Sequence, residues 1–177
     1  DDATRDGEGS GEPGLEVRPR ATLASLLTSM RGEREAWKPL YGAFRALARF
    51  GNEPGDAQRL ATIAAMLTEK PAPRAALVFQ GQAVRAAERL GNASTTVRAL
   101  ATEAELLERA GDLEQARASA RQARAYSLKI ADSTVRGLYT ASVDLVDGAV
   151  WIHSRPDSAI TAFRAAINRY RQTQNLL

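Results

Sequence analysis

The chain repeats itself with a period of 40 residues, and this repeat restricts the possible folds more than any other feature of the sequence. Residues 60–64 (LATIA) return as residues 100–104 (LATEA), and a fainter copy stands at residues 20–24 (RATLA). Two alanine series keep the same spacing: Ala36, Ala76 and Ala116, and Ala43, Ala83 and Ala123. Self-similarity at this length is typical of helical hairpins that stack and bury their apolar faces against one another.

Composition favours helices and excludes several classes of site. Only 6% of the residues are aromatic, and alanine, the strongest helix former, fills many apolar positions. The chain has no cysteine, which rules out disulfides, thiolate metal sites and cysteine nucleophiles. No apolar run reaches the roughly 20 residues needed to span a bilayer. We therefore expect no membrane segment, and a cytoplasmic protein.

The charge pattern does not indicate a nucleic-acid-binding surface. The net charge of +3 comes from 24 basic and 21 acidic residues that alternate along the chain, as in Glu88-Arg89 and Glu108-Arg109. Interspersed signs are typical of solvated helix surfaces and do not form a track for phosphates. The expected partner is a protein or a peptide, and not a nucleic acid.

The chain divides into a polar head and a repeat domain. Residues 1–19 are rich in Asp, Glu, Gly and Pro, and we expect them to form a disordered acidic tail or linker. From residue 20 to residue 177 the apolar positions follow a period of 3.6, which predicts helices. The expected repeat units are residues 20–52, 53–92, 93–132 and 133–175.

Local signals place the turns of these hairpins. Asp112 is a good helix N-cap because Gln115 follows three residues later. In the last repeat unit the hairpin should break near residues 154–157. A proline in a helix interior costs about 3 kcal/mol. We therefore expect the helix of Pro39 to begin near residues 36–38, or to be kinked.

The ends of the chain suggest a longer protein. The first residue is Asp1, and the last two residues are leucines where a helical array would have a polar cap. We expect further sequence, or an oligomer interface, at the C-terminal end.

The third repeat unit resembles the tetratricopeptide repeat (TPR) in the pattern Leu100, Ala104, Leu107, Gly111-Asp112, Ala116, Ala120 and Ala123. The longer period is similar to a bacterial type found in LuxR-type regulators, signal-transduction ATPases and caspase-like CHAT peptidases. This resemblance implies an all-α, right-handed α-solenoid of three to four hairpins. It also implies an interaction scaffold or regulatory module of a larger bacterial protein. The alternative is the recruiting segment of a CHAT peptidase whose catalytic domain lies beyond residue 177.

In this architecture the first helix of each repeat unit lines a concave face that binds a peptide or helix. Residues 134–138 (TVRGL) echo residues 96–100 (TVRAL) at a spacing of 38, and this echo sets the register of the fourth unit. The predicted partner-binding residues are Gln58, Thr68, Arg98, Glu105, Glu108, Arg109, Arg136, Tyr139, Val143 and Asp147.

No residue cluster predicts a catalytic, cofactor or metal site. His153 is the only histidine, which leaves too few ligands for zinc. Asp144 and Asp147 share a helix face and are interpreted as a solvated or partner-facing patch. The stripe formed by Trp37, Tyr41 and Phe44 is expected to pack in the core, with a ligand anchor as the alternative. For Trp151 both a buried and a projecting position are open.

Overall fold

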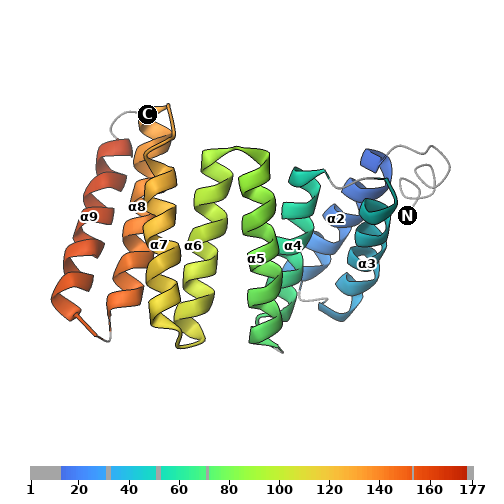
Figure 1. Cartoon of the computed structure of the whole chain (residues 1–177), viewed down its shortest axis with the longest axis horizontal. Helices are drawn as coiled ribbons and strands as arrows, with labels where there is room; N and C mark the ends of the chain where they lie inside the picture. Colours follow the sequence, from blue (N-terminus) through green and yellow to red (C-terminus); the bar gives the residue numbers. More distant parts are fainter. Residues whose placement is uncertain (1–12, 31–32, 51–52, 71, 153, 175–177) are drawn as a thin grey trace. The chain divides into compact units, whose positions relative to one another are not determined.

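A computed structural model describes residues 13–30, 33–50, 53–70, 72–152 and 154–174 (Figure 1). Within these ranges the chain forms helices and no strand, so the all-α prediction is confirmed. None of the described helices combines the length and the apolar character needed to cross a membrane.

The chain forms two compact blocks, Asp1–Leu90 and Gly91–Leu177. The helices of the N-terminal block are α2 (Pro13–Ser29), α3 (Glu33–Phe50), α4 (Pro54–Thr68) and α5 (Pro73–Leu90). Those of the C-terminal block are α6 (Ala93–Arg109), α7 (Leu113–Ser127), α8 (Ser133–Trp151) and α9 (Pro156–Gln174). Each block contains two helical hairpins, and the first helix of its second hairpin packs against both helices of the hairpin before it.

Burial follows the 40-residue period of the sequence. Both alanine series seen in the sequence are fully buried: Ala36, Ala76, Ala116, Ala43, Ala83 and Ala123. A third series lies in the first helix of each hairpin: Ala21, Ala61, Ala101 and Ala141. Alanine at these positions lets helices approach closely, because a larger side chain would overfill the contact. The sequence repeat is therefore a repeat of the core.

The turn between α6 and α7 forms as predicted. Gly111 has φ +82°, and its N–H donates to the Glu108 carbonyl at 2.9 Å while the Asp112 N–H donates to the Leu107 carbonyl at 2.9 Å. These two hydrogen bonds define a Schellman motif, which favours glycine at the position of Gly111 because the backbone there has a positive φ. Asp112 then caps α7 by accepting the Gln115 N–H at 3.2 Å. The hairpin of the last repeat unit also breaks as predicted, between Trp151 and Pro156.

The predicted boundary of the acidic tail is wrong. Helix α2 begins at Pro13, so residues 13–19 belong to the first hairpin, whereas residues 1–12 lie outside the described part. Val17 is fully buried together with Ala21 and Ala24 on one helix face. The many polar residues around Val17 concealed this apolar stripe in the sequence.

The expected start of α3 is also wrong. The helix begins at Glu33, which places Pro39 in its interior. Proline removes the bond to the carbonyl four residues earlier, at a cost of about 3 kcal/mol. Leu40 and Leu47 are buried on the same helix, and each contributes about 1.5–3 kcal/mol. Tertiary packing thus offsets the proline.

Candidate functional site

A groove of about 330 Å³ lies between α6 and α8 in the C-terminal block. Helix α6 lines it with Arg98, Ala101, Thr102 and Glu105. This spacing of i, i+3, i+4 and i+7 keeps the four residues on one helix face. The core side chains Leu100 and Ala104 lie on another face of α6. The same helix therefore supports the core and presents a groove.

The opposite wall of the α6–α8 groove is aromatic. Tyr139 of α8 and Tyr170 of α9 both line it, and both are half-buried. Tyrosine offers a large apolar ring and a polar hydroxyl at low entropic cost, which is why it is common in binding surfaces. Buried Ala101 contributes little bulk to the lining. An apolar side chain of a ligand can therefore lie between rings and alanine.

Two opposite charges lie on the α6 wall. Arg98 is exposed, and no described carboxylate pairs with it. Glu105 is exposed, and its Oε2 lies 3.9 Å from Nη2 of Arg109. Because an α-helix rises about 1.5 Å per residue, Arg98 and Glu105 are about 10 Å apart along α6. The groove therefore has a cation at one end and, at the other end, a carboxylate that lies close to Arg109.

The structure brings together three of the predicted partner-binding residues, Arg98, Glu105 and Tyr139. Arg109 touches this group through Glu105, whereas Glu108 is half-buried and does not line the groove. The prediction missed five lining residues: Ala101, Thr102, Leu138, Ser142 and Tyr170.

Three predicted residues of the fourth repeat unit do not line this groove, and the prediction for Val143 is wrong because Val143 is buried. The Arg136 Nη1 donates to the Ile130 carbonyl at 3.0 Å, Val143 is fully buried, and Asp147 pairs with Arg124 of α7. The cause is that the TVRGL echo led us to align the third and fourth repeat units at a spacing of 38 residues. The buried positions instead repeat at a spacing of 40 residues. An alignment error of two residues rotates the predicted helix face by about 200°.

An alignment of the third and fourth repeat units at a spacing of 40 residues identifies two groove residues that the TVRGL echo missed. Arg98 and Thr102 then correspond to Leu138 and Ser142, and all four line the groove. The alanine series already present in the sequence contained this signal.

The two predictions in the N-terminal block do not describe an open surface. Thr68 is buried, and its Oγ1 donates to the Ala64 carbonyl at 2.7 Å, so the prediction for Thr68 is wrong. Gln58 is half-buried, and its Nε2 donates to Thr62 Oγ1 at 3.0 Å. Each of these two side chains forms its hydrogen bond within α4.

We expected Asp144 and Asp147 to form a solvated or partner-facing patch, but both carboxylates form ion pairs with arginines of the same block. Asp144 is buried, and its carboxylate binds Nη2 of Arg124 on α7 at 2.7 Å and Nε of Arg169 on α9 at 2.8 Å. Arg124 also binds Asp147. Burial alone would lower the pKa of Arg124, but hydrogen bonds and charges from Asp147 and Asp144 outweigh it and raise that pKa. These ion pairs connect three helices.

Two arginines lie close to the ring of Trp151. The guanidinium carbon of Arg117 lies 4.1 Å from the centre of the indole ring, and that of Arg155 lies 5.0 Å from it. Arg117 Nη2 also donates to Ser154 Oγ at 3.0 Å. Trp151 is half-buried, and its contacts with Arg117 and Arg155 connect the α8–α9 turn to α7. His153, in that turn, lies outside the described residues.

The aromatic stripe of α3 is not core, contrary to our expectation. Tyr41 is 65% exposed and Trp37 is 38% exposed, whereas Phe44 is half-buried. The Phe44 ring lies 6.5 Å from the Phe79 ring between centroids. Helical spacing correctly placed the three aromatic residues on one helix face, but it did not show that this face is partly exposed.

The described residues contain no group of three or more His, Asp or Glu side chains arranged to hold a metal ion. Comparisons of the chain with protein-family models, with curated proteins and with solved structures found no match. The chemistry of the α6–α8 groove is therefore the basis for a functional proposal.

Proposed function

We propose that this chain is a non-catalytic, TPR-like repeat module that binds a peptide segment of another protein in the α6–α8 groove. The observation that carries the proposal is the grouping of Arg98, Glu105, Tyr139 and Tyr170 around one groove. Unlike charges at two ends and aromatic rings between them are the features of a peptide-binding surface.

The proposed architecture is a right-handed α-solenoid within a larger bacterial protein. Its support is the recurrence of buried alanines at 40 residues in all four hairpins, together with the stacking of hairpins inside each block. A hairpin of this kind buries its apolar face only when a neighbour covers it. Repeats of this type leave side chains of successive first helices available to a ligand.

The groove chemistry suggests the form of the ligand. One apolar or aromatic side chain would lie against Ala101, Tyr139 and Tyr170. A carboxylate would pair with Arg98, and a basic group would pair with Glu105 about 10 Å away. That separation corresponds to about three residues of an extended peptide. The ligand is therefore a short segment in which an acidic residue and a basic residue flank an apolar one.

Selection from a displayed library of random 12-residue peptides against the full chain tests this proposal. We expect enrichment of the acidic–apolar–basic pattern. The double variant Arg98→Glu/Glu105→Lys reverses the two charges and should select the opposite order of charges. Arg121→Glu is a matched control, because Arg121 is exposed on α7 and does not line the groove. Identical selections from the wild type and the charge-reversed variant would refute the assignment.

A further inference from the structure

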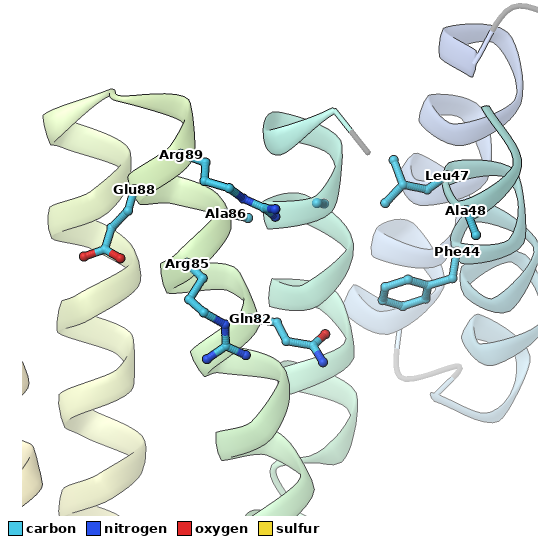
Figure 2. A pocket seen from close by; sticks show the side chains of 9 residues that line it. Phe44, Leu47, Ala48, Gln82, Arg85, Ala86, Glu88 and Arg89 are labelled. Atoms are coloured by element: carbon cyan, nitrogen blue, oxygen red, sulfur yellow. The ribbon is translucent and has the colours of Figure 1, made fainter. Parts of the chain in front are cut away.

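We infer that a second groove, between α3 and α5 in the N-terminal block, binds an acidic amphipathic helix of a partner protein. This α3–α5 groove has a volume of about 930 Å³ (Figure 2). Its lining comes from α3, α4 and α5. The inference concerns a different surface from the α6–α8 groove and does not depend on the function proposed for that groove.

One wall of the α3–α5 groove is apolar. Phe44, Leu47 and Ala48 of α3 line it together with Ala57 of α4 and Ala86 of α5. In Figure 2 the side chains of Phe44 and Leu47 extend from α3 toward α5. The Phe44–Phe79 contact joins α3 to α5.

The apolar wall continues along α3 beyond the cavity. Trp37 and Tyr41 precede Phe44 and Ala48 at helical spacing, so the four side chains share one face. From Trp37 to Ala48 this face extends about 16 Å along the helix. Since Trp37 and Tyr41 are both exposed, a ligand helix of about eleven residues has continuous apolar contact.

The other wall is basic. Arg85 and Arg89 of α5 line it together with Gln82, and both arginines are exposed. No carboxylate in the described part of the chain forms an ion pair with either arginine. Glu88 also lines the groove. In Figure 2 its side chain extends to the side of α5 away from Phe44 and Leu47, whereas Arg89 extends toward α3. With two arginines and one glutamate, the α5 wall has a net positive charge.

The spacing of the arginines selects the kind of ligand. Arg85 and Arg89 are four residues apart, which is about 6 Å along α5. Carboxylates at positions i and i+4 of a ligand helix have the same separation, and paired guanidinium–carboxylate hydrogen bonds are strong. A helix with such acids beside an apolar stripe therefore complements both walls at once.

A second copy of this chain does not supply such a helix from its most apolar exposed surfaces. Leu26 of α2 and Met30 directly after α2 are exposed, but residues 17–30 include no acidic residue. On α9, Ile160 and Ile167 are exposed beside Arg164 and Arg171. These surfaces would repel Arg85 and Arg89 or leave them unpaired. The occupant is consequently a segment of another protein.

The test uses the full chain and three synthetic 18-residue helical peptides. All three carry the same leucine stripe, flanked at i and i+4 by glutamate, glutamine or lysine. Fluorescence anisotropy of the labelled peptides gives each dissociation constant. We expect the glutamate peptide to bind at least tenfold more tightly than the lysine peptide, with the glutamine peptide between them.

Two charge-reversed variants separate the groove from the general charge of the protein. Arg85→Glu/Arg89→Glu should reverse the order of the peptides. Arg59→Glu/Arg74→Glu removes the same charge from exposed residues of α4 and α5 outside the groove, and it should keep the original order. If both variants weaken the glutamate peptide equally, binding is unspecific and the inference fails.

A third variant tests the apolar wall, and one measurement tests the identity of the occupant. Ala48→Glu places a carboxylate on the exposed apolar side, so it should weaken the glutamate peptide about tenfold without lowering the melting temperature. Unchanged affinity would overturn the assignment of this wall. Sedimentation equilibrium of the protein alone should show a monomer. A dimer that Arg85→Glu/Arg89→Glu dissociates would place a second copy in the groove and overturn the inference.

Discussion

Substituting Gly148 by alanine tests the packing of the last hairpin. A Cβ atom on Gly148 would lie 2.5 Å from Cε1, 2.7 Å from Cδ1 and 2.8 Å from Cζ of Phe163. Overpacking of this kind costs about 1–3 kcal/mol. Alanine returns up to about 1 kcal/mol of helix propensity. We therefore expect Gly148→Ala to lower the free energy of unfolding by about 1–2 kcal/mol.

Urea denaturation followed by circular dichroism measures this loss. Gly55→Ala is the matched control, because Gly55 lies in α4 and an alanine Cβ there would meet no neighbouring atom within 4 Å, so it should be neutral or stabilising. Phe163→Leu in the Gly148→Ala background should recover part of the loss, since the two residues are in contact and their effects are not additive. A Gly148→Ala protein as stable as the wild type would refute the reasoning.

Three further substitutions test the turn, the core and the ion pairs by the same denaturation assay. Gly111→Ala should cost about 1 kcal/mol, because alanine disfavours a positive φ; no loss would contradict the Schellman turn. Ala116→Leu should cost about 1–3 kcal/mol by overfilling the hairpin contact, and an unchanged midpoint would show that the contact has room. Asp144→Ala should cost about 1–3 kcal/mol, because Arg124 and Arg169 lose a shared partner but stay partly solvated; a more stable variant would show that the pairs do not support the fold.

The repeat was readable from the sequence because small residues at the helix contacts leave little freedom. Ala76 and Ala116 occupy equivalent positions, and both are fully buried. The third repeat unit also carried its own turn signals in Gly111 and Asp112. Where core and turn signals agreed, the helices formed as predicted.

Predictions failed where a local pattern competed with packing. The TVRGL echo aligned the third and fourth units at a spacing of 38 residues, but the buried positions repeat at 40. Arg136 and Val143 therefore do not line the groove. Pro39 led us to predict a later start for α3. The helix nevertheless begins at Glu33, because the burial of Leu40 outweighs the unfavourable effect of proline in a helix interior. A local signal is worth about 3 kcal/mol or less, which a few buried side chains exceed.

Contacts between helices were beyond the reach of sequence patterns. Arg124 and Asp144 are 20 residues apart, and Arg169 is a further 25 residues away, so no helical spacing predicts their ion pairs. Tyr41 likewise belongs to an apolar stripe, and only the arrangement of α3 and α5 shows that it is exposed.

Photo-crosslinking at position 139 tests the central claim of peptide binding most directly. Tyr139 is replaced by p-benzoylphenylalanine in the full chain, and the protein is irradiated with a peptide selected from the library. The matched control carries the same replacement at Tyr126, a half-buried tyrosine of α7 that does not line the α6–α8 groove. We expect a covalent adduct from position 139 and none from position 126. Equal adducts at both positions, or none at position 139, would contradict the account.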